Sequence, residues 1–307
     1  MGKSTLLNRL IGQKLSIVTP KAQTTRQRLL GIYSDDDHQA VFVDSPGLLE
    51  PRYLLQERMR QEADRAIADA DLVLYVVDAG YAPSVEHALA LGRSDDAPSS
   101  GRPARTSPEG QLSPEDQPSP EGRPWILCLN KVDRLTPEER LDLQARLDGP
   151  PWDVLVPTVA TEGLGVEELK SEVLRRLPLS PPFYPPEDLA VAPVRFFVAE
   201  IIRETAFERL AAEVPYATAV TIEEYREPED EAKPVYIDAV IHVERPSQKG
   251  IVIGSGGKMI RRIGTEARLK IEEFTGRKVY LDLRVKVLRN WRRREGALKL
   301  LGFRPKT

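Results

Sequence analysis

The fold is decided by residues 125–133, which read WILCLNKVD. The first five of these residues are apolar and predict a short buried strand, and Asn130-Lys131-Val132-Asp133 follows where that strand ends. An aspartate in such a loop can accept hydrogen bonds from the N1–H and the exocyclic amine of guanine, a donor pair that adenine lacks in this arrangement. A carboxylate left unpaired by the wrong base would cost free energy, so residues 130–133 predict a guanine site.

Outward from this strand, apolar strands alternate with amphipathic helices as far as residue 177. The pattern predicts strands at 40–43, 72–77 and 154–157, a helix start at 4–11, and helices at 55–67, 137–147 and 166–177. Alternation of this kind implies a mostly parallel α/β sheet.

Gly2-Lys3-Ser4-Thr5, directly after Met1, is the second half of the phosphate-binding pattern G-x-x-x-x-G-K-[ST]. In that pattern, backbone amides at a helix start surround the phosphates. Lys3 would reach the β- and γ-phosphates, and the Ser4 hydroxyl would bind Mg²⁺.

Two further motifs lie between this helix and the guanine motif. Asp44-Ser45-Pro46-Gly47 follows a strand, where the aspartate would hold Mg²⁺ and the Gly47 amide would contact the γ-phosphate. Thr25, in Thr24-Thr25-Arg26, would complete the Mg²⁺ shell in the triphosphate state. Each motif alone fits a turn, a helix cap or a surface loop, but the set in this order predicts a GTPase domain.

Two segments interrupt the alternation. Residues 94–122 hold 6 Pro, 6 Ser and 3 Gly, with Ser-Pro-Glu recurring every six residues from Ser107. Such a segment cannot bury enough apolar surface to offset its ordering entropy, so we expect a disordered insertion; a docking tract is the alternative. Residues 178–193 are proline-rich and predict an interdomain linker. We therefore expect domains at 1–177 and 194–307.

Beyond the linker, the predicted order is a helix (194–213), strands at 218–225 and 235–243, helices at 248–253 and 258–275, and a strand at 278–287. Gly254-Ser255-Gly256-Gly257 lies between the two short helices. A KH domain uses such a G-x-x-G loop to hold about four backbone nucleotides, because glycine lets the chain approach the phosphates. A flexible turn between helices is the alternative. The predicted RNA-binding residues are Ile253, Gly254, Ser255, Gly256, Gly257, Lys258, Arg261 and Arg262.

Charge is distributed unevenly along the chain. The net charge is −3, but residues 245–307 carry 18 Lys/Arg against 5 Asp/Glu, whereas the remaining residues carry 26 against 42. This asymmetry predicts that the C-terminal end meets a polyanion; a solvated surface of mixed charge is the alternative. Lys286, Arg289 and Arg292–Arg294 would extend the basic path, and Trp291 would either pack in the core or stack on a base.

The composition excludes several classes of protein. Of 307 residues, 41% are hydrophobic and 30% are charged, as in globular proteins. The single cysteine, Cys128, excludes a disulfide framework. No apolar run approaches the roughly 18 residues of a membrane-spanning helix. The first twenty residues lack the order of a signal peptide, so we expect a cytoplasmic protein.

Taken together, these motifs make the sequence resemble the bacterial Era family of GTPases. The resemblance covers nearly the whole chain except the insertion. The motifs that carry the resemblance are Thr5-Leu6-Leu7-Asn8, Lys21-Ala22-Gln23-Thr24-Thr25-Arg26, Asp44-Ser45-Pro46-Gly47-Leu48 and Asn130-Lys131-Val132-Asp133. The resemblance implies an α/β P-loop GTPase domain followed by an α+β type II KH domain. As in that family, a leucine, Leu48, replaces the glutamine that positions water, so intrinsic hydrolysis should be slow.

The resemblance also implies a function and a set of site residues. We expect hydrolysis of GTP to GDP with Mg²⁺, binding of single-stranded 16S rRNA near its 3′ end, and assistance to 30S subunit biogenesis. We further expect a monomer with peripheral association at the inner membrane. The implied nucleotide residues are Gly2, Lys3, Ser4, Thr5, Asp44, Gly47, Asn130, Lys131, Asp133 and Ala160; the Mg²⁺ ligands are Ser4, Thr25 and Asp44; and the catalytic residues are Lys3, Thr25, Gly47 and Leu48.

Two departures from the family pattern matter. The first half of the family's P-loop and the central strand before it are absent from the sequence, which starts at Met1-Gly2. By resemblance, the missing half includes the Asn that helps to place a monovalent cation, and its absence disfavours the possible activation by K⁺. Neighbouring strands would then lack a ladder partner. We expect that the printed start lies downstream of the true one; the alternative is a nucleotide-impaired RNA-binding assembly factor. The last guanine motif is Val159-Ala160-Thr161, in which the Ala160 amide would serve guanine O6.

Two related classes of protein share part of this pattern. A GTPase with tandem G domains and a KH-like end is disfavoured by the single N-K-x-D motif. A DNA-directed KH protein would be recognised by binding that does not depend on the 2′-hydroxyl.

Overall fold

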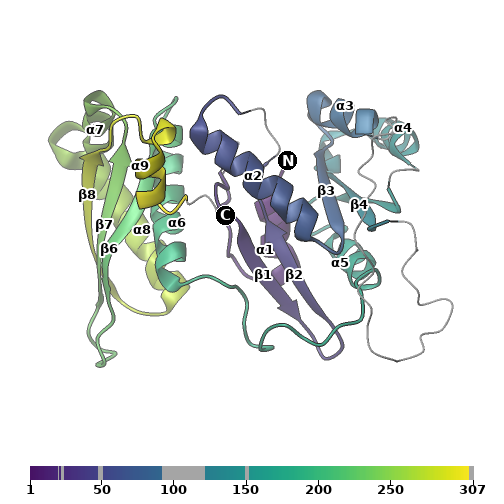
Figure 1. The fold of residues 1–307 in the computed structure, drawn as a ribbon, viewed down its shortest axis with the longest axis horizontal. Coiled ribbons are helices and arrows are strands. Elements are labelled where there is room, and N and C mark those ends of the chain that lie inside the picture. The colour runs from purple at the N-terminus through teal and green to yellow at the C-terminus, as the bar shows by residue number, and fades with distance from the viewer. Residues whose placement is uncertain (20, 22–23, 48–50, 92–121, 149–151, 304–307) are drawn as a thin grey trace. The chain divides into compact units, whose positions relative to one another are not determined.

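The computed structural model describes residues 1–19, 21, 24–47, 51–91, 122–148 and 152–303. Leu48 and all but the last residue of the predicted insertion lie outside the described residues. Figure 1 shows the elements up to residue 177: α1 (Lys3–Ile11), β1 (Leu29–Ser34), β2 (Gln39–Asp44), α2 (Leu54–Asp69), β3 (Val73–Asp78), α3 (Ala82–Leu91), β4 (Trp125–Asn130), α4 (Pro137–Leu147), β5 (Val154–Thr158) and α5 (Val166–Leu174).

The C-terminal part begins with a long helix. Its elements are α6 (Val194–Arg209), β6 (Ala219–Arg226), β7 (Val235–Val243), α7 (Pro246–Ile253), α8 (Lys258–Thr275), β8 (Val279–Val287) and α9 (Glu295–Leu300). Single 3₁₀ turns occur at Val132–Arg134, Pro215–Ala217, Ser255–Gly257 and Trp291–Arg293.

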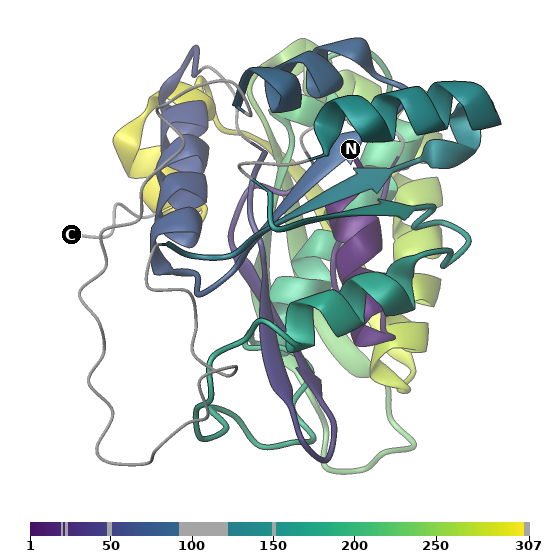
Figure 2. The same cartoon turned by 90° about the vertical axis from the view of Figure 1, so that its right-hand side faces the viewer.

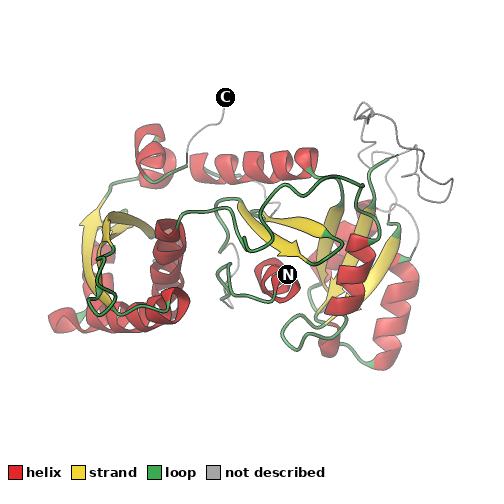
Figure 3. Ribbon diagram, turned by 90° about the horizontal axis from the view of Figure 1, so that it is seen from below, coloured by secondary structure: helices red, strands yellow, loops and turns green. Residues whose placement is uncertain are grey.

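A parallel three-stranded sheet, β3-β4-β5, forms the centre of the N-terminal part. Its strands read as continuous apolar runs because helices cover both faces. Helices α3 and α4 pack on one face against Leu127 and Leu129, and α1 and α5 pack on the other against Ile126 and Cys128 (Figure 3). Parallel strands end at one edge, so the loops after β4 and β5 lie together there.

The remaining strands of this part form a separate sheet. β1 and β2 pair with each other, and among the described strands neither pairs with β3, β4 or β5. This separation agrees with the expectation that strands beside a missing central strand lack a ladder partner. In the turn between them, the amides of Asp37 and His38 donate to Asp35 and lower the pKa of that carboxyl to about 2.

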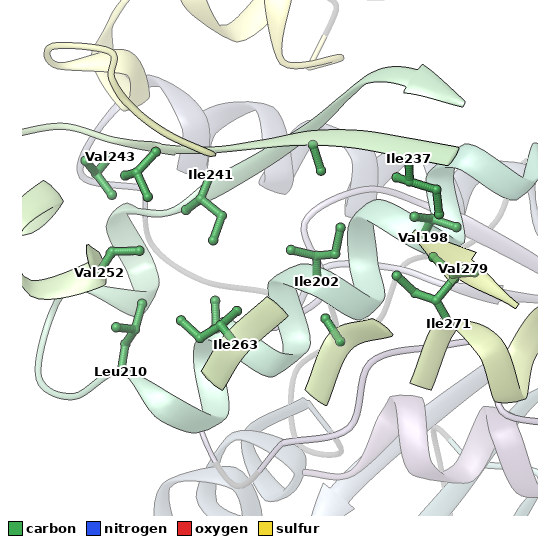
Figure 4. Close-up of a cluster of buried hydrophobic side chains, with 14 of the residues drawn as sticks. Val198, Ile202, Leu210, Ile237, Ile241, Val243, Val252, Ile263, Ile271 and Val279 are labelled. Atoms are coloured by element: carbon green, nitrogen blue, oxygen red, sulfur yellow. The ribbon is translucent and has the colours of Figure 1, made fainter. Parts of the chain in front are cut away.

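The C-terminal part is a three-stranded sheet with helices on one face, the predicted α+β class. β6 pairs antiparallel with β7, and β7 pairs parallel with β8. Figure 4 shows the core between this sheet and helices α6 and α8, with Ile202, Ile241 and Ile263 completely buried. The order of helices and strands is that of the predicted KH domain.

The chain forms two compact units that alternate along the sequence. The first unit contains residues 1–14, 31–42 and 67–189, and the second contains residues 15–30, 43–66 and 190–307. The second unit therefore includes both segments expected to sense the nucleotide. Within it, Leu55 and Met59 of α2 pack against Trp291 and Leu298, and Figure 2 shows α2 beside the yellow C-terminal segment.

The predicted linker contains bends and a turn, and hydrogen bonds hold it. The Gln39 carboxamide accepts from the amides of Phe183 and Tyr184 and donates to the Tyr184 carbonyl. Near its end, the Val191 amide donates to Leu30 of β1 at 3.1 Å.

None of the helices in the described part of the chain is both long and apolar enough to cross a membrane.

Candidate functional site

Helix α1 begins at the predicted phosphate-binding residues. Gly2 precedes it with a φ of 92°, and a Cβ there would lie 2.6 Å from Nδ2 of Asn130, so the position requires glycine. Lys3, Ser4 and Thr5 form the first turn. Unpaired backbone amides and the helix dipole favour an anion at this end of a helix. The described half of the loop therefore has the local geometry of a phosphate site.

Asn130 joins three loops at the carboxyl edge of the sheet. Its Nδ2 donates to the Met1 carbonyl at 2.9 Å, and its Oδ1 accepts from the Thr158 hydroxyl at 3.1 Å and from the Ala160 amide at 3.0 Å. The side chain is buried, so these bonds fix the N-terminal loop against the ends of β4 and β5.

The Ala160 amide thus has a partner within the protein. The same loop is held from α1, because Arg9 Nε donates to the Ala160 carbonyl at 3.2 Å and Arg9 Nη2 to the Thr161 carbonyl at 2.5 Å. The expected contact between the Ala160 amide and guanine O6 stays a prediction, and it would have to share or replace the bond to Asn130.

Lys131 forms an ion pair at the end of β3. Its backbone has a φ of 65°, and its Nζ lies 2.5 Å from Oδ2 of Asp78. The N-terminal amine of Met1 lies 3.6 Å from the same oxygen. Burial acts to raise the pKa of Asp78, but Lys131 and the N-terminal amine outweigh it and hold that pKa below its ordinary value.

Asp133 lies in the 3₁₀ turn directly after β4, where its side chain is exposed. The carboxylate is therefore accessible to a base placed beside the Asn130 loops. Its role in guanine recognition stays a prediction.

Thr25 and Asp44 meet in the second unit. Asp44 ends β2 and is 4% exposed, and Oγ1 of Thr25 lies 3.2 Å from its Oδ2. Hydroxyl and carboxylate oxygens are the donors that Mg²⁺ prefers, so this pair has the chemistry of two of the expected ligands. The described residues contain no group of three or more His, Cys, Asp or Glu side chains arranged as a metal site.

The G-x-x-G loop adopts backbone angles that favour glycine. Gly254, Gly256 and Gly257 have φ values of 71°, 57° and 75°. A Cβ on Gly254 would lie 2.7 Å from the Cβ of Met259, so a side chain there would collide with α8. The loop surface is therefore backbone, as close contact with phosphates requires.

Basic and apolar side chains border this loop. Lys258 is exposed, Arg261 folds back to the Gly256 carbonyl, and Arg262 pairs with Glu266 at 3.1 Å. On the apolar side, Ile251 is half exposed, and Ile253 and Ile260 are partly buried against the core. The predicted RNA residues thus form one surface, on which Lys258 is exposed directly after the loop.

The basic path beyond β8 differs in part from the expectation. Arg292 forms an ion pair with Glu244 and lies over the ring of Tyr53, 5.0 Å from its centroid. Trp291 is completely buried and donates to the Ala217 carbonyl at 2.9 Å. Of the two expectations for Trp291, packing in the core is confirmed and base stacking is wrong, because the ring has no exposed face.

The sequence did not reveal which residues hold the segment before Thr25. Arg203 and Glu204 of α6 are buried charged residues that contact this segment. The only local signal is that these two charges lie between the apolar pairs Ile201-Ile202 and Ala206-Phe207, and the segment that they contact lies about 180 residues away in sequence.

A phosphate-type helix start and an N-K-x-D loop at the carboxyl edge of a parallel sheet, followed by a G-x-x-G domain, define a P-loop GTPase joined to a KH domain. A family model described as a 50S ribosome-binding GTPase matches residues 1–100, and one described as a KH domain matches residues 213–292. GTPase Era from Leuconostoc citreum is 40% identical over 305 residues, which cover 99% of this chain and 92% of that protein. The chain belongs to the Era family of GTPases, and it is a GTP-hydrolysing enzyme.

Two crystal structures resemble the chain over its length. One is Era in complex with MgGDPNP and nucleotides 1506–1542 of 16S ribosomal RNA, with a TM-score of 0.84 and 33% identity over 99% of this chain and 95% of that chain. The other is a single-residue variant of Era from Aquifex aeolicus bound to GDP·AlF₄⁻, with a TM-score of 0.83 and 32% identity over the same shares.

Proposed function

We propose that this GTPase binds single-stranded 16S rRNA near its 3′ end through the KH domain, under the control of bound GTP or GDP, and assists biogenesis of the 30S subunit. The observation that carries the proposal is the Gly254–Gly257 loop, held in positive-φ conformations beside an apolar edge and exposed Lys258. A relative of the chain was crystallised with both MgGDPNP and a 16S fragment, which supports the same pairing of ligands here.

In the proposed nucleotide site, the α1 amides and Lys3 hold phosphate oxygens, and Asp133 selects guanine. The oxygens of Ser4, Thr25 and Asp44 would hold Mg²⁺, which would bridge the β- and γ-phosphates and neutralise their charge. Thr25 contacts the ion only in the triphosphate state, so this residue distinguishes GTP from GDP.

Hydrolysis in this proposal is slow without a partner. The Gly47 amide contacts the γ-phosphate, whereas Leu48 offers no hydrogen bond to orient the attacking water. The remaining stabilisation comes from Lys3 and from positioning of the nucleotide. Other groups, or a partner, would have to supply the rest.

The proposed switch uses the predicted domain limits, 1–177 and 194–307. GTP orders the loops around Thr25 and Leu48, the domains change position across the 178–193 linker, and the KH cleft becomes accessible; hydrolysis reverses the change. Equal RNA affinity with GDP and with a GTP analogue would exclude this step.

In this proposal the protein is a cytoplasmic monomer that associates peripherally with the inner membrane. Activation of GTP hydrolysis by K⁺ is disfavoured by the missing Asn. The basic C-terminal region, with 18 Lys/Arg against 5 Asp/Glu in residues 245–307, supports contact with a polyanionic surface.

A nucleotide-impaired RNA-binding assembly factor is the second candidate. The observation that favours it is the division of the N-terminal strands into two sheets, which leaves the edges of β2 and β3 without partners among the described strands. The nucleotide titration below separates the two candidates.

The first test is a titration of the 307-residue chain with a fluorescent GDP analogue and Mg²⁺. We expect saturable binding that GTP displaces and ATP does not. Asp133→Asn should lose guanine nucleotides and gain xanthine nucleotides, since an amide can donate to the O2 of xanthine. Absence of binding in the parent chain, with intact RNA binding, would support the second candidate.

The second test measures RNA affinity by fluorescence anisotropy with an oligonucleotide of the 16S 3′ end. Ser255→Asp places a negative charge in the exposed loop and should weaken binding by about tenfold or more. Ser180→Asp adds the same charge at an exposed linker position and should leave affinity within about twofold. Equal loss in both variants would contradict a specific role of the loop.

A further inference from the structure

We propose that Arg26 is a positioning residue that fixes the nucleotide-sensing loop to the RNA-binding unit and thereby holds Thr25 in place for GTP. The loop concerned is the switch strap, defined as the described residues of segment 15–26. The inference rests on the proposed function, because it assigns a cause to the preference for GTP over GDP.

The guanidinium of Arg26 is buried inside the second unit. Its Nη1 donates to the Thr218 carbonyl at 2.5 Å, and its Nη2 donates to the Tyr216 carbonyl at 3.0 Å. The rings of Phe207 and Trp291 lie 5.6 and 5.7 Å from its central carbon. Planar donors between aromatic faces suit arginine and not lysine, so the site is specific for the side chain present.

Arg26 keeps its charge in this environment. Burial and the neighbouring Arg203 lower the pKa of Arg26 to about 9, which still leaves it protonated at neutral pH. Release of the strap would leave the buried Thr218 carbonyl without its donor and would break the contacts with the two rings, and these losses oppose release.

Four further hydrogen bonds attach the strap to α6 and to Leu210, which directly follows it. The Val18 amide donates to Oε1 of Glu204 at 3.0 Å. Lys21 Nζ donates to the Leu210 carbonyl at 2.6 Å and to the Phe207 carbonyl, where the negative end of the helix dipole favours a cation. Arg203 Nη2 donates to the Thr24 carbonyl at 2.5 Å.

These contacts fix the residues on both sides of Thr25. Thr24 is held by Arg203, and Arg26 is held by the turn before β6, so the backbone at Thr25 has little freedom to move away. In this position, the Thr25 hydroxyl already lies 3.2 Å from Asp44 Oδ2. The strap therefore holds the threonine beside its expected co-ligand.

A preference for GTP follows from this arrangement. A ligand shifts a conformational equilibrium only by its differential affinity for the two states. GTP gains from a fixed Thr25 and GDP does not, so loss of the Arg26 contacts should lower GTP affinity selectively. By reciprocity, it should also reduce the difference in RNA affinity between the two nucleotide states.

The test compares Arg26→Lys with Arg60→Lys. Arg60 is an exposed residue of α2 that pairs only with Asp64 among the described residues, so it controls for an arginine-to-lysine change. Affinities for GDP, for a non-hydrolysable GTP analogue and for the 16S oligonucleotide are measured on the full chain. We expect Arg26→Lys to lower the GTP-analogue to GDP affinity ratio by about fivefold or more, with GDP affinity within about twofold.

Amide hydrogen exchange without nucleotide gives an independent readout. In the parent chain, the strap should be protected to a similar degree as α6, and Arg26→Lys should accelerate exchange only in the strap. Free exchange of the strap in the parent chain would overturn the inference, whether or not the nucleotide site is competent. So would an unchanged affinity ratio in Arg26→Lys together with accelerated exchange.

Lys21→Gln guards against failure of the first variant to fold. It removes a partly exposed contact in the middle of the strap and should shift the affinity ratio in the same direction by a smaller factor. Loss of GDP binding in the parent chain would contradict the proposed function instead, since GDP does not require Thr25.

Discussion

At the scale of single residues, burial lowers the pKa of His242. The side chain lies on β7 and is 6% exposed, with Nε2 2.9 Å from the Thr221 hydroxyl. Nδ1 has no hydrogen-bond partner within the part of the chain that the structure describes. Burial, assisted by the charge of Lys286, holds the pKa of His242 below its ordinary 6.5. The imidazole is therefore neutral in the folded protein at pH 7.

This depressed pKa predicts a loss of stability in mild acid. Between the folded and unfolded pKa values, His242 binds more protons in the unfolded chain, so its contribution to the free energy of unfolding falls as pH drops below about 6.5 and is constant above that pH. His242→Gln keeps a partner for Thr221 and removes the titration. Urea unfolding from pH 7 to about pH 5 should show a smaller slope for the variant than for the parent. Equal slopes would contradict the assignment.

At the scale of elements, the short helix α9 contributes one buried side and one exposed side to the second unit. Leu298 is completely buried against α2 and Trp291, whereas Leu300, two residues later, is 67% exposed. Two leucines in one helix therefore offer a matched comparison of packing.

Leu298→Ala should destabilise the protein by about 2–5 kcal/mol, because it removes buried methyl groups and leaves a cavity. Leu300→Ala should change the free energy of unfolding by less than about 0.5 kcal/mol. Urea denaturation of the full chain measures both values. Similar losses in the two variants would show that α9 does not pack as described.

The elements that sequence predicted best have local signals at both ends. Helix α4 begins at a capping box, in which Glu139 N donates to the Thr136 hydroxyl and Thr136 N donates to the Glu139 carboxylate. Helix α8 is bounded by Gly257 and Gly276, both with positive φ. Strand β7, at 235–243, was predicted with the same bounds because apolar residues fill it.

The elements that sequence missed depend on distant partners. β1, α3 and α9 were not predicted, since none of them shows a clear hydrophobic period. Helix α6 was expected to reach residue 213 but ends at Arg209, because Leu210 turns into an extended conformation and packs into the core. Local helix propensity loses to tertiary packing at that point.

The residues of the candidate site also fall into a group that the sequence predicted and a group that it did not. Each motif could be predicted because its functional side chains lie within four consecutive residues, as at residues 130–133. The contacts of Arg26 were not predictable, since its carbonyl partners lie 190–192 residues away and no side-chain type marks them.

At the scale of the whole molecule, the two compact units do not follow the order of the sequence. The chain passes through them in six alternating segments, and residues 15–30 and 43–66 belong to the same unit as residues 190–307. The predicted domain limits, 1–177 and 194–307, separate the GTPase motifs from the G-x-x-G loop. The compact units instead place Thr25 and Asp44 in the same unit as that loop.

The packing of α2 on α9 limits how the KH half could be transplanted. A fragment cut at residue 194 would lose Leu55 and Met59 and uncover the apolar surface of Trp291 and Leu298. It would also lose Arg26, whose guanidinium fills the space between Phe207 and Trp291. Residues 194–307 therefore do not contain the whole core of the second unit. A chimeric protein that uses this unit would have to include residues 15–30 and 43–66 as well.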